Sequence, residues 1–453
     1  MQKKLIALAI AGLSSAAFAQ SNVTIYGTMD AGFETARAGG ATPTAAGLSG
    51  RDMAGRNRIT TNSSNIGFKG AESLGNGLTA VFQIETQISA DGSNSASAVP
   101  NVFGNTSGSV WNTRDTYMGI AGGFGTVAIG YLSTPHRTLA ASYDVMPGAT
   151  GSAASTTSLI GRINVGTALN AGTTAVGTTA NNFGGTTALG GGVTGANSVV
   201  YLSRENAIAY ITPTFNGFSG VIAYVPNEGK FGSPNVNPGN GKNPAGWNLA
   251  LNYANGPLKV GFSHLALTDA GVLAGVTAGS GTTTGLVTGG EKHKANLFGA
   301  AYTFNGATTV SFLWDNFKGT VSTVAGTAGG DITVKRNAYM IGVKHVMGAH
   351  EIAGQYSKAK SVDVGGPTAL AAAAAGNSFG GSGANMFALR YGYNFSKRTQ
   401  AYVLYSQINN GSDGNYDFGT GGAVANTVSV DGTNRINAGA DPRAFGVGLR
   451  HSF

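Results

Sequence analysis

The chain of 453 residues contains no cysteine. That absence excludes disulfide bonds, thiolate metal sites and thiol nucleophiles. Charged residues are scarce, at 11%, against about 25% in ordinary soluble domains. Long apolar runs are missing too. The longest run of small residues, 369–375, is far shorter than the about 20 residues that a membrane-spanning helix needs. A membrane protein of this composition would therefore have to cross the bilayer as strands.

Signatures of several functional classes are also absent. The formal net charge is +8, but the basic residues are scattered, so we expect no nucleic-acid partner. The six histidines have no metal-ligand spacing. The glycine-rich stretches lack the Lys-Ser/Thr ending of a phosphate-binding loop. We therefore predict no catalytic residue, no cofactor and no metal site, and we expect the protein not to be an enzyme.

The first residues have the pattern of a secretory signal peptide. Lys3 and Lys4 precede an apolar core at 5–13, and 17–19 reads Ala-Phe-Ala, a small-x-small cleavage pattern. We expect residues 1–19 to be removed and residues 20–453 to form the mature protein outside the inner membrane.

The remaining chain alternates apolar and small or polar residues, as strands with one face in lipid require. In the last run, the apolar-face positions from Phe445 to Phe453 alternate with small or polar residues. Short turns, several of them Asn-Gly, permit the positive φ of tight hairpins. We predict sixteen strands, near 23–35, 58–73, 78–89, 113–121, 124–134, 204–214, 218–226, 246–255, 258–268, 292–304, 307–318, 335–347, 350–360, 384–395, 398–409 and 442–453.

This pattern predicts an all-β, 16-stranded antiparallel transmembrane β-barrel with short periplasmic turns and long outer loops. The longest gap between strands, about 135–203, is rich in Gly, Thr and Ala. The same texture returns at 269–290, 361–383 and 411–440, which we expect to be surface loops.

Several segments resemble the trimeric general (non-specific) porins of Gram-negative bacteria, of the β-proteobacterial type. The opening V-T-I-Y-G at 23–27 is similar to the V-T-L-Y-G of that family, and 64–75 is similar to its S-R-x-G-F-K-G-x-E-x-L-G motif. The stretch 204–218 resembles its R-x-N-S-x-x-Y-x-S-P-x-F-x-G-F pattern. The terminal Phe453 also matches the family.

The resemblance implies a homotrimer in the outer membrane, surrounded by outer-membrane lipid and lipopolysaccharide, that passes small hydrophilic solutes and ions. It implies that the third outer loop, here 135–203, folds inward as a constriction. It also implies a field between basic wall residues and acidic loop residues, which sets ion selectivity.

This sequence lacks many of the charged residues that would produce such a field. Asn65, Tyr131 and Thr28 stand where the family often carries basic wall residues, and Arg204 remains. Asp144 is the single acid of the long gap, and Arg162 is the only charge between Asp144 and the next strand. We therefore predict weak ion selectivity with at most a mild anion preference.

Strand alternation places further charges on the water-filled face. These residues are Asp30, Lys69, Arg114, Lys344 and Arg390. For Arg114 the expectation rests on its alternation with Tyr117. A charge on a wet wall can simply be solvated, and we keep that interpretation open for Lys69, Lys344 and Arg390.

Two other functions remain open at this stage. A substrate-specific channel for sugars or carboxylates would carry a line of aromatic residues or a dense arginine ladder, and Tyr131 could belong to such a line. A surface adhesin or structural protein would use the Gly/Thr/Ala insertions for binding.

Overall fold

The computed structural model describes residues 22–42, 52–88, 114–146, 158–163, 204–228, 245–268, 291–322, 331–366, 379–418, 436 and 438–453. The predicted signal peptide and most of the low-complexity insertions lie outside these residues.

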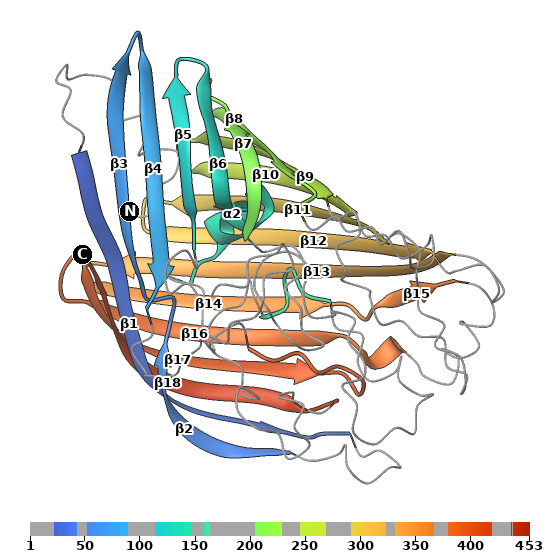
Figure 1. Cartoon of the computed structure of the whole chain (residues 1–453). Helices are drawn as coiled ribbons and strands as arrows, with labels where there is room; N and C mark the ends of the chain where they lie inside the picture. Colours follow the sequence, from blue (N-terminus) through green and yellow to red (C-terminus); the bar gives the residue numbers. More distant parts are fainter. Residues whose placement is uncertain are drawn as a thin grey trace.

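The described residues form one antiparallel sheet of eighteen strand segments, shown in Figure 1. The segments are β1 (Asn22–Gly39), β2 (Met53–Thr61), β3 (Asn65–Gly75), β4 (Leu78–Gln87), β5 (Thr116–Gly122), β6 (Gly125–Ser133), β7 (Arg204–Ile211), β8 (Phe218–Val225), β9 (Ala245–Asn255), β10 (Leu258–Thr268), β11 (Glu291–Phe304), β12 (Thr308–Ser322), β13 (Asp331–Met347), β14 (His350–Ala359), β15 (Asp363–Gly365), β16 (Ala384–Asn394), β17 (Thr399–Asn410) and β18 (Asp441–Ser452).

The sheet closes on itself, because β1 pairs with β18 on one side and with β3 and β2 on the other. Segments β2 and β3 follow each other along β1, and β14 and β15 follow each other along β13. Each of these pairs is therefore one interrupted strand. The barrel has sixteen strands, as the sequence predicted, and closure leaves no exposed edge for lipid.

Alternation along the strands matches the predicted faces. In β16, Phe387 and Leu389 are 41% and 44% exposed, whereas Ala388 between them is fully buried. In β18, Phe445, Val447 and Leu449 are exposed and Ala444 is buried. We call the apolar, exposed side of the strands the outer face and the opposite side the inner face.

The short turns also match their prediction. Asn76, Asn216 and Asn305 have φ values near +50°, and each is followed by a glycine with positive φ. Asparagine and glycine tolerate this left-handed conformation, which two-residue hairpins require.

One helix longer than a single turn occurs in the described part of the chain. This helix, α2 (Pro135–Tyr143), follows directly on β6 and lies against the wall formed by β8 to β12 (Figure 1). The Thr134 side chain accepts a hydrogen bond from the Arg137 amide at 3.2 Å, and Pro135 occupies the first helical position. Among the described residues, no helix has the length and hydropathy to cross a membrane.

The segment 411–418, which follows β17, differs from its prediction. We expected 411–440 to be a surface loop, but Tyr416 and Phe418 are fully buried in the same apolar cluster as Leu139 and Leu159. The prediction is wrong for this segment because the apolar lumen contacts outweigh its polar composition. Two aromatic residues flanking Asp417 were the available sequence signal.

Candidate pore lining and the inward segments

Helix α2 sits in a shallow depression of the inner face. The depression exists because Gly261 and Gly299, which are directly paired across β10 and β11, carry no side chain there. A Cβ atom on Gly299 would collide with the ring of Tyr143, and one on Gly261 would collide with Leu139. The first part of the predicted third loop, which forms α2, therefore lies against the inner face of the wall.

A second stretch of the same loop, 158–163, is tied to the wall farther round the barrel. The Arg336 guanidinium forms an ion pair with Asp315, and both side chains are fully buried. Arg336 Nη1 also donates to the Leu159 carbonyl at 2.7 Å, and the Gly161 amide donates to Asp315 Oδ2 at 2.9 Å. Charge-assisted bonds of this kind are stronger than neutral ones. They hold the inward loop against β12 and β13.

Two predicted loop charges prove to be structural. Arg162 is 3% exposed and its Nη1 donates to the Asp417 carbonyl at 3.2 Å, which joins the two inward segments. Asp144 directly follows the last residue of α2, and its carboxylate accepts a hydrogen bond from the Met146 amide at 2.7 Å. Neither side chain faces open water, so we do not count either toward the field in the pore.

His136 lies in the first turn of α2 and is completely buried. Its amide donates to Asn248 Oδ1 at 2.8 Å, and its Nδ1 lies 3.1 Å from the Ser263 hydroxyl. Burial lowers the pKa of His136 to about 4, because an imidazolium would lose its hydration. The neutral ring therefore helps to dock the helix.

The wall ends of β4 to β7 carry a rim cluster, which we define as Glu85, Arg114, Asp115, Ser133 and Arg204. Arg114 forms an ion pair with Glu85. Arg204 Nε lies 2.6 Å from Asp115 Oδ1, which also accepts from the Ser133 hydroxyl at 2.7 Å. The cluster borders Thr134, where the chain leaves the wall for the lumen.

The strand geometry contradicts the predicted alternation at the start of β5. β5 begins at Thr116, so Arg114 precedes it, and Tyr117 shares the inner face with buried Ala121. The predicted alternation of Arg114 with Tyr117 is therefore wrong, because the chain bends before the strand starts. Glu205, which is 2% exposed, is a buried acid of this region that the sequence analysis did not select.

Tyr131 is half-buried in β6 and stands opposite Thr116 and Asn206 in the register. It follows Gly130, whose φ is 144°. Tyr131 has the same alternation in β6 as the exposed Val127 and Ile129, so the strand register does not place it in an inner-face line of aromatic residues.

A second network covers the wall where β16, β17 and β18 meet β1. Asp30 accepts hydrogen bonds from the Tyr402 hydroxyl at 2.7 Å and from Arg450 at 3.3 Å. Arg390 lies 4.5 Å from the centroid of the Tyr402 ring, pairs with Glu351 at 3.3 Å and donates to Gln400 at 2.6 Å. Asp30 and Arg390 thus belong to one network on the inner face.

Three other predicted residues occupy the inner wall near the start of the chain. The Thr28 hydroxyl is 3.2 Å from that of Ser452, and Asn65 Nδ2 donates to the Ser63 carbonyl at 2.8 Å. Lys69 Nζ lies 5.1 Å from the centroid of the Tyr26 ring, whose hydroxyl donates to Glu85 at 2.9 Å.

Paired charges are the main electrostatic feature of the wall. Several arginines of the wall form ion pairs with carboxylates of the wall in the part of the chain that the structure describes. The pairs are Arg58–Glu34, Arg114–Glu85, Arg204–Asp115, Arg336–Asp315, Arg390–Glu351 and Arg450–Asp30. Sequence spacing gives no sign of these contacts, because most partners stand on different strands.

Inner-face lysines behave differently. Lys69, Lys259 and Lys344 form no ion pair with any residue that the structure describes. Alternation puts them on the inner face beside Gly67, Gly261 and Gly342, close to the short turns. Lys259 is not predicted from the sequence to be an inner-face residue. It stands next to the Asn255-Gly256 turn, where the period-two pattern is too short to show which face of the strand a side chain occupies.

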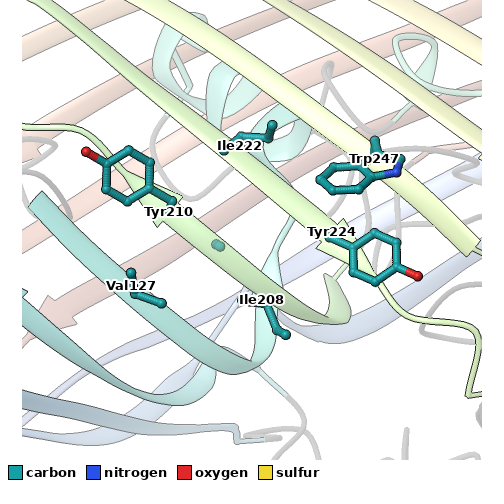
Figure 2. Close-up of a pocket in the computed structure, with 7 residues that line it drawn as sticks. Val127, Ile208, Tyr210, Ile222, Tyr224 and Trp247 are labelled. Carbon is teal, nitrogen blue, oxygen red and sulfur yellow. The ribbon is translucent and has the colours of Figure 1, made fainter.

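Beyond the lumen, the described residues contain no cluster of three His, Cys, Asp or Glu side chains able to hold a metal ion. A shallow apolar groove lies on the outer face of β6 to β9, where the rings of Tyr224 and Trp247 pack at a tilt of 40° with their centroids 4.6 Å apart. Figure 2 shows its lining residues Val127, Ile208, Tyr210, Ile222, Tyr224 and Trp247. Its apolar lining suits the lipid side of the wall.

Comparison with known proteins agrees with this architecture. Residues 5–414 match the Gram-negative porin family. Outer membrane porin protein 32 of Delftia acidovorans is 28% identical over 462 aligned residues, which cover both chains completely. The major outer membrane protein P.IB of Neisseria gonorrhoeae is 30% identical over 257 residues, or 56% of this chain and 54% of that protein.

Among solved structures, the anion-selective porin from Comamonas acidovorans superposes with a TM-score of 0.61 at 22% identity, over 96% of this chain and all of that one. The trimer form of OmpT from Vibrio cholerae superposes with a TM-score of 0.51 at 13% identity, over 96% and 99% of the two chains. Family match, full-length relative and closed barrel agree: the chain belongs to the Gram-negative porin family and is an integral β-barrel of the outer membrane.

Proposed function

We propose that the barrel is a diffusion pore for small hydrophilic solutes and ions, narrowed by the third loop at 135–203 and weakly selective for anions. The proposal also covers assembly as a homotrimer in outer-membrane lipid and lipopolysaccharide, export with a cleaved signal peptide, and the absence of enzymatic activity. The trimer form of one similar structure supports the assembly.

The proposed selectivity rests on a contrast between two kinds of basic residue on the inner wall. The arginines are paired with carboxylates, whereas the lysines have no carboxylate partner among the described residues. An ion pair with an N–O distance of 3.3 Å or less has a field that falls off quickly, because the opposite charges largely cancel beyond a few ångströms. The lysines Lys69, Lys259 and Lys344 keep a net positive charge on the wet wall. A small surplus of this kind raises the local anion concentration without excluding cations.

The pairing of arginines with carboxylates on the wall also argues against an electric field across the pore of the type that the resemblance implied. In that arrangement, basic wall residues face acidic loop residues across open water. Here the loop acid Asp144 is buried just after α2, where it accepts a hydrogen bond from the Met146 amide. The acids instead stand beside their arginines on the wall. Polar solutes would therefore pass with little orientation by charge.

Planar-bilayer recordings in a salt gradient test this proposal. The wild-type protein should give a small reversal potential of the sign expected for anions. The triple variant Lys69→Gln, Lys259→Gln, Lys344→Gln should move that potential toward zero with little change in conductance. A control triple on the outer face, Lys294→Gln, Lys318→Gln, Lys335→Gln, should leave it unchanged.

Strong cation selectivity of the wild-type channel would refute the proposed anion preference. Liposome swelling with solutes of graded size separates a diffusion pore from a substrate-specific channel. A pore should show rates that fall smoothly with solute size, whereas one solute passing far faster than others of equal size would indicate a specific channel.

A further inference from the structure

A row of three lysines crosses the outer face of neighbouring strands. Lys294 of β11 stands directly opposite Lys318 of β12, and Lys318 stands opposite Lys335 of β13. All three side chains are exposed, and each alternates with buried inner-face residues on its own strand. They therefore point away from the lumen. We call these residues the lysine row.

The lysine row is electrostatically unfavourable by itself. Adjacent strands lie about 4.8 Å apart, so directly opposed like charges repel. None of the three lysines forms an ion pair or side-chain hydrogen bond with a residue that the structure describes. Asp363 stands opposite Lys335 in the register and offsets one charge of the row. The net positive charge that remains calls for an anion from outside the chain.

The rows below the lysines form an ordered gradient from polar to apolar. The next outer-face row is a hydrogen-bonded chain in which His264, Asn296, Asn316 and Asn337 follow one another, with distances of 2.8, 3.4 and 3.0 Å. The row after that is aromatic, with Phe262, Phe298, Trp314 and Tyr339 in register. Aromatic side chains gather where a barrel crosses from headgroups to hydrocarbon.

The order of the rows locates the lysines at the outer end of the barrel. The opposite ends of β11 to β13 meet in the short turns near Asn305 and Gly348. Short turns lie on the periplasmic side of such barrels. The lysine row is therefore at headgroup depth in the outer leaflet, with the aromatic row at the top of the hydrocarbon.

We infer that this face is a binding site for the phosphorylated headgroup of lipopolysaccharide. The phosphates would neutralise the lysine row, sugar hydroxyls would hydrogen-bond to the amide row, and acyl chains would lie along the aromatic row and the exposed Phe312 and Ile341 below it. Lys358, on the next strand and in register with Tyr339, extends the positive face. The site rests on the proposed placement in a lipopolysaccharide-containing leaflet and is independent of conduction through the pore.

The arrangement favours a polyanionic lipid over the alternatives. A zwitterionic phospholipid brings no net charge to offset three lysines. Free phosphate would gain nothing from the aromatic and aliphatic rows. A protein partner would have to cover outer-face residues that continue without a break into the apolar band.

Native mass spectrometry of the purified, detergent-solubilised full-length protein tests the inference by titration with diphosphoryl lipid A. The triple variant Lys294→Gln, Lys318→Gln, Lys335→Gln should bind about a hundredfold more weakly, since each lysine at an anionic surface contributes roughly 1 kcal/mol. The triple Lys→Arg variant at the same positions should bind like wild type. The inner-face triple variant at Lys69, Lys259 and Lys344 is the matched control and should also bind like wild type.

Three results would overturn the site: unchanged affinity in the Lys→Gln variant, equal binding of phosphatidylethanolamine, or displacement of lipid A by inorganic pyrophosphate at similar concentration. Single-channel conductance is recorded on the same variants. The lysine-row variant should conduct like wild type, which shows that it is folded. A failure of lipid binding with normal conductance therefore refutes this site alone, and a failure of conductance in wild type refutes the pore.

Discussion

At the scale of single residues, arginines of the inner wall are paired with carboxylates of the wall. The Arg336–Asp315 pair does more than neutralise two charges. Arg336 also donates a hydrogen bond to the Leu159 carbonyl, and Asp315 also accepts one from the Gly161 amide. Burying an ion pair costs desolvation, so its net contribution to stability is small. Its value lies in fixing the position of residues 158–163.

Removing one member of that pair should release the inward loop. Asp315→Asn leaves Arg336 buried without its charge partner, and breaking a buried pair costs about 3–5 kcal/mol. We expect larger or noisier single-channel currents, because segment 158–163 would leave the wall. Arg58→Gln breaks the comparable Arg58–Glu34 pair, for which no contact to 158–163 is described. If both variants give the same currents as wild type, Arg336 and Asp315 do not position the loop.

His136 should make docking of α2 sensitive to acid. Its pKa is about 4 when buried and about 6.5 when free. The docked helix is therefore fully stabilised above pH 6.5 and loses stability as pH falls toward 4. The loss amounts to roughly 3 kcal/mol, since one pKa unit corresponds to about 1.4 kcal/mol.

Conductance recorded between pH 7 and pH 4 measures this effect. The wild-type channel should change its current level or noise as the pH falls through this window. His136→Asn cannot take up a proton, so the component of the pH response due to this residue should vanish. A variant with an unaltered pH response would show that His136 does not control docking.

At the scale of elements, α2 depends on fit rather than on its own helix propensity. Nine residues are too few for a stable isolated helix. The Thr134 cap and Pro135 set where it begins, and contacts of Leu139 and Tyr143 with the glycine-lined wall hold it.

Gly299→Ala should displace the helix, because the new methyl group would occupy the place of the Tyr143 ring. Overpacking of this kind costs about 1–3 kcal/mol. We expect altered conductance, with an intact β-sheet circular-dichroism spectrum. In a Tyr143→Ala background the same glycine substitution should have little further effect, and Gly55→Ala, where a Cβ meets nothing within 4 Å, should be silent in wild type. Additive effects of the two substitutions would contradict a direct contact.

At the scale of the whole molecule, stability depends on closure of the sheet between its first and last strands. Gly27 and Phe453 exchange two backbone hydrogen bonds, each 3.1 Å long, just beyond the end of β18. An open edge in lipid would leave such groups without partners, at a cost of several kcal/mol per group.

Deletion of Phe453 should therefore weaken the closed barrel by about 2 kcal/mol, the ordinary value of two hydrogen bonds. The measurement is urea unfolding in detergent, followed by the heat-dependent migration of folded barrels in gels. Phe453→Leu keeps both backbone bonds and serves as the matched control. Equal unfolding midpoints for the deletion and wild type would show that closure does not depend on this residue.

The sequence predicted the strands well because alternation is a local property. Each of the sixteen predicted ranges coincides with a strand or interrupted strand, and the Asn-Gly turns have the positive φ values that they imply. The sequence predicted the segments inside the lumen less accurately. The pattern predicts no helix at α2, although Thr134-Pro135 is a helix-start signal. It predicts a surface loop at 411–418, where Tyr416 and Phe418 are buried.

What the sequence alone determined is thus the barrel itself, because a strand in lipid must show its alternation within about ten residues. Which charges meet was decided by the tertiary structure. Asp315 and Arg336 acquire a role from the approach of residues 158–163, and Lys294, Lys318 and Lys335 become one row only through strand register. Contacts between strands and between a loop and the wall depend on closure, and closure is a property of the whole sheet.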